Sequence, residues 1–157
     1  MKTITSPEET QLYEKTPTLF LAGGITGCPP WQEIVCEKLA EKDKDYNYIL
    51  FNPRRKKWDM NDKDISERQI LWEHKYLLRS DVVAFWFPKE TLCPITLFEL
   101  GLMLRSEKRV IVGTDPEYQR RFDLDIQIPL YKFFVKRTNH LDALVEIISK
   151  EMRSYFL

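Results

Sequence analysis

The sequence contains few of the residues from which metal sites and disulfide frameworks are built. Its 157 residues include only three cysteines, two histidines and five glycines. The cysteines have no CxxC spacing and are odd in number, so neither a disulfide framework nor a zinc ribbon fits. The two histidines, His74 and His140, lie far apart in the chain, which disfavours a His-based metal site or a Ser-His-Asp triad. We therefore expect reduced thiols and no bound metal.

An excess of one charge and a long apolar run are also missing. Lysine plus arginine and aspartate plus glutamate both total 24, so bulk charge predicts no binding to a nucleic acid polymer or an anionic membrane. No stretch approaches the roughly 18 apolar residues of a membrane span, and the first residues hold no apolar run of signal-peptide length. These observations predict a cytoplasmic protein.

Short apolar runs alternate with amphipathic segments along the chain. Residues 1–17 are polar and aperiodic, and we expect them to form an arm before a single domain that covers residues 18–157. The apolar runs predict strands at residues 18–24, 48–53, 81–88, 109–114 and 129–135. The segments between them predict helices at residues 31–42, 64–79, 94–105 and 139–153.

This alternation predicts an α/β fold with a five-stranded parallel sheet. The expected strands are continuously apolar, as in strands that are covered on both faces, and right-handed crossovers place the helices in two layers around the sheet. In such sheets a ligand binds outside the carboxyl ends of the strands, where the strand order reverses. That rule selects four loops, at residues 23–32, 52–58, 88–96 and 114–128.

Glu99 is the first candidate for chemistry. It is the only acid between Glu90 and Glu107, in a helical segment that is otherwise largely apolar. A carboxylate is costly to bury unless it is paired or hydrogen-bonded. One interpretation is an acid that interacts with the dipole at a helix N-terminus. The other, which we favour, is a reactive carboxylate at the mouth of the expected crevice.

Glu73 is the second candidate. On a helix it shares a face with Ile70 and Leu77, which a surface carboxylate would normally avoid. Alternatively, Trp72 and Tyr76 dominate the buried stripe and Glu73 only borders it. Two carboxylates that project into one crevice from different helices form the arrangement that breaks glycosidic bonds.

Several other residues belong to the selected loops. Gly23 and Gly24 let backbone approach a ligand closely, although a simple turn explains them equally well. Trp31 could stack on a flat heterocycle or lie in the core. Arg54, which follows Asn52, could reach a carboxylate, a phosphate or a base edge.

Two further residues favour structural interpretations. Asp81 stands at the start of an expected strand, where a carboxylate commonly binds backbone N–H groups. Cys93 has no accompanying histidine, so we expect a packed or partly exposed thiol.

Four segments together resemble a known family. The strings FLAGGITGCPPWQ, NPRR with a following tryptophan, QILWE and DVVAFWFPKETLCPITLFELG look like the nucleoside 2-deoxyribosyltransferase-like proteins, which are small flavodoxin-like α/β enzymes. The resemblance runs from about residue 19 to about residue 128, and the ITLFELG segment is its most diagnostic part. It implies a flavodoxin-like three-layer sandwich.

The resemblance also implies roles for individual residues. Glu99 would be the nucleophile that attacks the anomeric carbon of a 2-deoxyribonucleoside, and Glu73 would handle the proton on the departing or incoming base. Trp31, with Gln32 near it, would pack against the base. Better-studied members have an aspartate six residues before the nucleophile, where this chain has Cys93; Thr91 or Thr96 would substitute for it.

The resemblance implies an assembly as well. Family members borrow a polar side chain from a neighbouring subunit to hold the 5′ end of the sugar, and here Asp123, Asp125 and Gln127 are candidates. The loop that contains them mixes charges with large apolar groups, which predicts an interface in a homo-oligomer.

The expected function is therefore exchange of nucleobases on 2′-deoxyribonucleosides through a covalent glycosyl-glutamate. This reaction needs no cofactor, and its partners are nucleosides and nucleobases. An apolar pocket roofed by aromatics such as Trp31, Trp58 or Phe87 would shield the intermediate from water. Two alternatives remain open: a nucleoside 5′-monophosphate N-glycosidase that grips phosphate through Arg54 and the glycine loop, and a non-catalytic nucleotide-binding domain.

Overall fold

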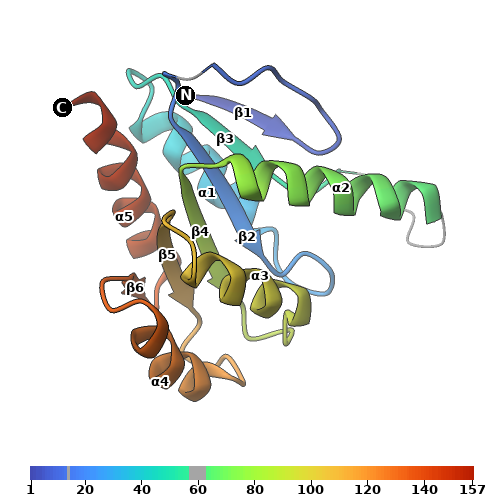
Figure 1. Ribbon diagram of the computed structural model, residues 1–157, viewed down its shortest axis with the longest axis vertical. Helices are drawn as coiled ribbons and strands as arrows, with labels where there is room; N and C mark the ends of the chain where they lie inside the picture. Colours follow the sequence, from blue (N-terminus) through green and yellow to red (C-terminus); the bar gives the residue numbers. More distant parts are fainter. Residues whose placement is uncertain (14, 57–62) are drawn as a thin grey trace.

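The computed structural model has the α/β fold predicted from the sequence, with a parallel sheet between two layers of helices (Figure 1). It describes residues 1–13, 15–56 and 63–157. The strands are β1 (Lys2–Thr5), β2 (Thr18–Gly23), β3 (Ile49–Asn52), β4 (Val82–Phe87), β5 (Arg109–Thr114) and β6 (Lys136–Thr138). The helices are α1 (Trp31–Lys42), α2 (Lys63–Arg79), α3 (Pro94–Leu104), α4 (Arg121–Tyr131) and α5 (Leu141–Arg153), followed by a short 3₁₀ helix η1 (Ser154–Phe156).

The strand order places the reversal point between β2 and β4. The sheet order is β1-β3-β2-β4-β5-β6, and every neighbouring pair is parallel. From β2 onward this is the flavodoxin-like order: β3 is added on one side of β2, and β4, β5 and β6 are then added on the other side. The loops after β2 and β4 therefore flank the position where this fold binds its ligands.

The sheet has one strand more than predicted, because the N-terminal segment is part of it. Residues 2–5 pair with β3 in the register Lys2↔Ile49 to Thr5↔Asn52. The residues that follow cross α2, where Trp72 Nε1 donates to the Glu8 carbonyl at 2.7 Å and the Tyr76 hydroxyl donates to Glu9 at 2.7 Å. The expected arm is thus wrong for this segment. Its polar pattern is that of an edge strand.

The strand predicted at residues 129–135 is also wrong. Residues 129–131 complete helix α4, whose buried stripe is formed by Leu124 and Ile128. The last strand is β6, which is polar and largely exposed. The apolar residues at 130–134 are mostly exposed side chains at the end of α4 and in the turn that follows it, and they do not form a buried strand.

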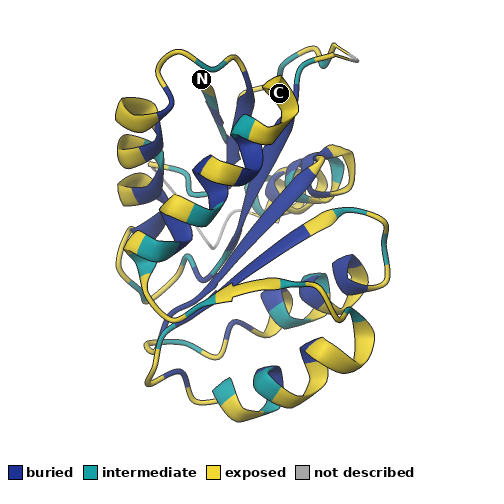
Figure 2. Ribbon diagram, turned by 90° about the vertical axis from the view of Figure 1, so that its left-hand side faces the viewer, coloured by how far each residue is buried: buried dark blue, intermediate teal, exposed yellow. Residues whose placement is uncertain are grey.

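Each face of the sheet has its own hydrophobic core. One core lies under α2, α3 and α4 and contains Phe20, Phe51 and Phe85. The other lies under α1 and α5 and contains Leu19, Leu21 and Leu50. Figure 2 shows the central strands buried along their length and the helices buried along one side only. Successive residues of β2 point into the two cores in turn, which explains why its sequence is continuously apolar.

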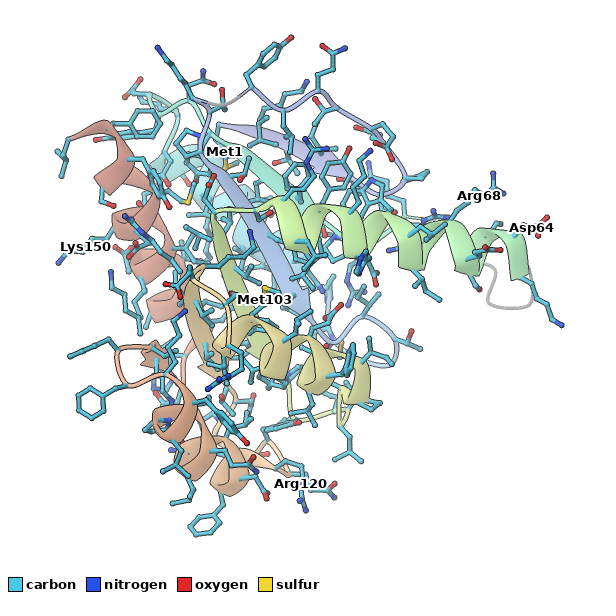
Figure 3. All side chains as sticks on the ribbon, viewed as in Figure 1. Met1, Asp64, Arg68, Met103, Arg120 and Lys150 are labelled. Carbon is cyan, nitrogen blue, oxygen red and sulfur yellow. The ribbon has the colours of Figure 1, made fainter. Side chains whose placement is uncertain are left out.

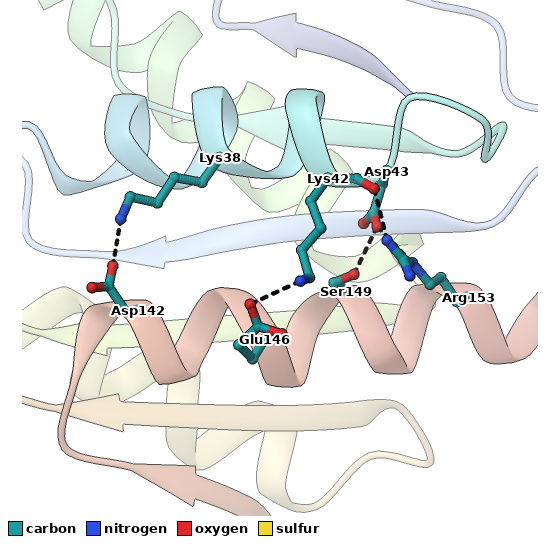
Figure 4. A network of polar contacts seen from close by, with 7 residues as sticks. All are labelled: Lys38, Lys42, Asp43, Asp142, Glu146, Ser149 and Arg153. Atoms are coloured by element: carbon teal, nitrogen blue, oxygen red, sulfur yellow. Dashed lines mark hydrogen bonds and ion pairs between the residues drawn. The ribbon is translucent and has the colours of Figure 1, made fainter.

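A buried carboxylate connects α1 to α5. It lies on the face of the sheet opposite to α2 and α3. Asp43, which is fully buried, accepts hydrogen bonds from Tyr48 (2.8 Å), Ser149 (2.7 Å) and Arg153 (2.8 Å). Figure 4 shows the contacts of Asp43 with Ser149 and Arg153 beside the ion pairs Lys38–Asp142 and Lys42–Glu146. Burial and the hydrogen bond to Asp43 raise the pKa of Tyr48.

Asp81 has the structural role that its position predicted. Its Oδ2 accepts hydrogen bonds from the Thr18 backbone N–H at 2.8 Å and from the Thr18 hydroxyl at 2.6 Å, which ties the start of β2 to the end of α2.

Within residues 1–13, 15–56 and 63–157, no helix is both long and apolar enough to cross a lipid bilayer.

Candidate active site

A cavity of about 540 Å³ opens at the reversal point, between α2, α3 and the loops after β2 and β4. Its lining brings together residues that lie up to 79 positions apart in the chain, from Phe20 to Glu99. The lining residues are Phe20, Ala22, Gly23, Gly24, Ile25, Thr26, Pro53, Ser66, Gln69, Ile70, Glu73, Thr91, Cys93, Pro94, Ile95, Thr96, Phe98 and Glu99. The cavity therefore contains both candidate carboxylates in walls that are mostly apolar.

Gly23 and Gly24 are required by close packing at the base of the cavity. A Cβ on Gly23 would lie 2.4 Å from the Trp86 carbonyl oxygen and 2.5 Å from Trp31 Cζ2. A Cβ on Gly24 would lie 2.9 Å from Thr91 Cγ2 and 3.0 Å from the Cys93 sulfur. Glycine thus lets the two loops at the reversal point touch, which closes the floor of the cavity.

Glu99 projects into the cavity from the second turn of α3. This helix begins at Pro94, directly after Cys93, which adopts the left-handed conformation with φ 49°. Cys93 is buried, and burial raises the pKa of its thiol to about 11, so the group stays protonated at neutral pH. Burial and the nearby charge of Glu73 raise the pKa of Glu99 to about 7. This shift brings the titration of Glu99 into the neutral range, so a nearby charge or hydrogen bond can favour either of its protonation states.

Glu73 reaches the same cavity from the middle of α2. Trp72, Tyr76 and Leu77 are buried and Glu73 lies at the border of that stripe, while Ile70 is 64% exposed. Gln69 Nε2 donates a hydrogen bond to Glu73 Oε1 at 2.6 Å. Burial raises the pKa of Glu73, and the Gln69 hydrogen bond and the charge of Arg55 lower it in part.

The two carboxyl groups thus occupy different surroundings in one cavity. Glu73 has a hydrogen-bond donor and a nearby cation, whereas the pKa of Glu99 is set by burial and by a like charge. Such a pair can keep one member ionised while the other carries a proton, which is what combined nucleophilic and acid–base chemistry requires. In the described part of the chain, no group of three His, Cys, Asp or Glu side chains could hold a metal ion.

Arg54 supports the loop after β2 and is absent from the residues that line the cavity in the described structure. Its Nη2 donates to the carbonyls of Ile25 (2.9 Å) and Pro29 (3.0 Å), and its Nε donates to Gln32 Oε1 (2.9 Å). Asn52 in turn accepts from the Arg54 backbone N–H at 2.9 Å. The guanidinium is therefore engaged with the protein itself.

Trp31 and Gln32 lie behind the cavity floor instead of in its wall. Trp31 is 2% exposed and Gln32 is fully buried. Trp31 Nε1 and Gln32 Nε2 both donate to the Gly24 carbonyl, at 2.9 and 3.1 Å. The expected stacking of Trp31 on a base does not match this position, because the ring packs against Gly23 within the core.

The aromatic roof expected from the sequence is also different. Phe87 is fully buried in the core, and Trp58 lies outside the described residues. The aromatic rings at the described cavity are those of Phe20 and Phe98, of which Phe98 is 75% exposed at the rim. Thr96 lines the cavity.

Asp123 and Asp125 are not among the cavity-lining residues of the described chain. They lie on α4, where Asp123 pairs with Arg120 at 3.1 Å and Asp125 pairs with Arg121 and Arg137. Helix α3 separates α4 from α2, as the positions of Arg120 and Arg68 in Figure 3 show. Within one chain these aspartates cannot hold a ligand in the cavity of Glu73 and Glu99.

Sequence reasoning missed the residues that complete the walls. Gln69 stands four residues before Glu73, and this helical spacing alone could have identified it. Phe98 and Ile95 precede Glu99 by one and four residues, and the sequence predicted no role for them at the site; they are 75% and 67% exposed. Apolar residues around a reactive group and apolar residues in a core look alike in a sequence.

Comparisons with known proteins agree with this architecture. A family model described as "nucleoside 2-deoxyribosyltransferase like" matches residues 16–118, which is more than half of the chain. A solved structure of a conserved protein from Enterococcus faecalis V583 superposes with a TM-score of 0.52 at 14% identity, covering 88% of this chain and 98% of that one. This likeness concerns the fold. A search of curated protein sequences finds no match.

Proposed function

The chain belongs to the nucleoside 2-deoxyribosyltransferase-like family, and on that premise we propose that it exchanges nucleobases on 2′-deoxyribonucleosides through a glycosyl ester on Glu99. The observation that carries this proposal is the presence of Glu73 and Glu99 in one cavity, where burial raises the pKa of both but only the shift of Glu73 is partly offset, by Gln69 and Arg55. The substrates are nucleosides and free bases. We place the activity in nucleotide salvage in the cytoplasm.

In the first half-reaction, Glu99 attacks the anomeric carbon of the sugar in the form of the pair that has Glu99 ionised and the proton on Glu73. The protein's own groups favour the other form, with Glu73 ionised, so we propose that the bound nucleoside shifts the proton to Glu73. A C1′–O bond to the carboxylate forms while the C1′–N bond to the base breaks, through an oxocarbenium-like transition state that the carboxylate stabilises. The departing base takes a proton from Glu73, which leaves Glu73 ionised.

The second half-reaction runs the same steps in reverse with another base. The incoming base attacks C1′, the bond to Glu99 breaks, and Glu73 takes the proton that the base loses. Transfer competes with hydrolysis, so water must be kept from the ester. The apolar rim formed by Ile70, Ile95 and Phe98 supports this requirement.

The remaining site residues have supporting roles in this proposal. Gly23 and Gly24 form the floor of the cavity, where the lack of a Cβ lets the two loops pack closely, and Thr96 supplies a hydroxyl near the sugar in place of the family's aspartate. Trp31, Gln32, Asn52 and Arg54 hold the loop that carries the glycines. The engagement of Arg54 with loop carbonyls favours the transferase over a 5′-monophosphate N-glycosidase that would use this arginine to grip phosphate.

We further propose that the site is completed in a homo-oligomer. Phe122 and Ile126 of α4 are 76% and 53% exposed, and Ile70 and Phe98 at the cavity rim are 64% and 75% exposed. Isolated chains rarely leave so many large apolar side chains in water. A second copy that covers them would bring Asp123 or Asp125 near the cavity of its neighbour.

A panel experiment tests the proposed activity. The protein is incubated with 2′-deoxyadenosine, 2′-deoxycytidine and their 5′-monophosphates, with and without free adenine or cytosine, and the products are separated by chromatography. The proposal expects new deoxyribonucleosides that depend on the acceptor base. Release of free base from monophosphates without an acceptor would support the N-glycosidase, and binding without any turnover would support a non-catalytic domain.

A further inference from the structure

The side-chain amide of Gln69 is held in one orientation by three groups. Gln69 is 2% exposed. Its Nε2 donates to the Pro53 carbonyl at 2.8 Å and to Glu73 Oε1 at 2.6 Å, so both N–H groups are used. Its Oε1 accepts a hydrogen bond from the Ser6 hydroxyl. A flipped amide would place its oxygen against the Pro53 carbonyl and the Glu73 carboxylate, which is unfavourable.

Ser6 connects this amide to a cation. The Ser6 hydroxyl accepts a hydrogen bond from Arg55 Nε at 3.2 Å, which leaves its own proton for Gln69 Oε1. Donors therefore follow one another in a single direction, from Arg55 through Ser6 and Gln69 to Glu73. In such a chain each hydrogen bond strengthens the next, because a hydroxyl or amide whose oxygen accepts a hydrogen bond becomes a stronger donor through its own O–H or N–H group.

We infer that Gln69 is a positioning residue for Glu73 and that Ser6, from the N-terminal segment, sets its orientation. The kinetic consequence rests on the proposed function, whereas the effect on Glu73 itself does not. Ser6 lies before residues 16–118, the part of the chain that matches the family model. The edge strand β1 therefore does more than extend the sheet: it ends next to Ser6 and delivers this hydroxyl to α2.

The groups that face Glu73 come from three elements. Gln69 lies on the same helix, Arg55 follows β3, and Glu99 projects from α3. The amide and the guanidinium favour the ionised form of Glu73, while burial and a charge on Glu99 favour the protonated form. A substitution that removes the hydrogen bond from Gln69 removes an interaction that favours the ionised form, so the proton affinity of Glu73 should rise.

The test measures that affinity directly in the full chain. Glutamate is labelled with ¹³C at the carboxyl carbon, and the Glu73 resonance is identified by its loss in Glu73→Gln. We expect Gln69→Met to raise the titration midpoint of Glu73 by about one pH unit, since a hydrogen bond to a charged group contributes that much. Ser6→Ala should raise it by about half as much, because Gln69 remains in place.

Ser80→Ala is the matched control. Ser80 is also buried and donates its hydroxyl hydrogen bond to the Tyr76 carbonyl at the other end of α2. It should leave the Glu73 midpoint unchanged. If Gln69→Met does not fold, Ser6→Ala carries the test alone.

The kinetic readout distinguishes this inference from the proposed function. If Glu73 is the acid in base exchange, the basic limb of the pH profile should move upward with its titration midpoint in both variants. A midpoint shift without any base exchange would leave the positioning role intact and contradict the proposed function. An unchanged midpoint in folded Gln69→Met and Ser6→Ala would overturn the positioning role.

Discussion

Glu73 and Glu99 face one cavity from two different helices, and burial together with the charge of Glu73 raises the pKa of Glu99 to about 7. Among residues 1–13, 15–56 and 63–157, a neutral donor, Gln69, is directed at the carboxylate of Glu73 and none at that of Glu99. The pair therefore has unequal members before any ligand is present, which is the condition for assigning one group to attack and the other to proton transfer.

Removing the nucleophile should abolish base exchange. Glu99→Gln keeps the size of the side chain but cannot form the glycosyl ester, so we expect a loss of several orders of magnitude in rate. Glu107→Gln, an exposed glutamate just beyond α3, is the control and should retain full activity. Retention of more than about a tenth of the activity in Glu99→Gln would contradict a covalent mechanism.

The pH profile should show an acidic limb near pH 7. The nucleophile must be ionised, and the pKa of Glu99 is raised to about 7, so the rate should fall as the pH drops through that value. Glu73→Gln removes the charge that contributes to this shift, so the acidic limb should move to lower pH. Glu67→Gln, exposed on the same helix, should leave it in place. An acidic limb that stays near pH 7 in Glu73→Gln would show that the two carboxyl groups do not interact.

Arg54→Met should loosen the loop after β2 without changing selectivity for phosphate. The substitution removes the donors to Gln32 and to the Ile25 and Pro29 carbonyls, so we expect about a tenfold rise in KM for nucleosides. The ratio of turnover between deoxyribonucleosides and their 5′-monophosphates should not change. Arg79→Met, exposed at the end of α2, is the control. A selective loss of monophosphate turnover in Arg54→Met would show that this arginine binds phosphate.

Asp43→Ala should destabilise the fold without touching the cavity. It leaves Tyr48, Ser149 and Arg153 without their common acceptor, and removing one member of a buried charged network typically costs about 3 kcal/mol. Urea unfolding should therefore show a lower midpoint with an unchanged slope. Asp45→Ala, exposed two residues later, should have little effect. Equal stabilities of the two variants would contradict the role of this network.

The chain should assemble in solution. Light scattering is expected to give at least twice the 18.8 kDa of one chain, and the double substitution of Phe122 and Ile126 by serine should reduce the mass and the activity together. Tyr13→Ser, which replaces an aromatic that is 68% exposed on the N-terminal segment, should change neither. A monomer that remains fully active on dilution would contradict a site shared between copies.

The central strands could be predicted from the sequence, whereas the edges could not. The predicted ranges for β2, β3, β4 and β5 agree with the structure to within one residue at each end, because strands buried on both faces are apolar between their end residues. The edge strands β1 and β6 expose most of their side chains, so their sequences resemble loops. Helix α4 was missed because its apolar stripe is short and leads into exposed aromatics.

The two carboxylates were identified from the sequence, but their surroundings were not. A lone acid in an apolar helix is unusual enough to be visible, which singled out Glu99. The burial of Trp31 was not visible, because a tryptophan after a glycine loop fits either the core or a ligand platform. The contact of Ser6 with Gln69 joins residues 63 positions apart and depends on the pairing of β1, which no local pattern encodes.

The most direct test of the covalent mechanism is the mass of the protein after incubation with a 2′-deoxy-2′-fluoro nucleoside. The fluorine destabilises the oxocarbenium-like transition state and slows breakdown of the glycosyl ester, so the intermediate accumulates. We predict that the intact mass increases by one fluorosugar, that peptide mapping places it on Glu99, and that Glu99→Gln shows no increase. An unchanged mass during continuing base exchange, or a sugar on any other residue, would contradict the account.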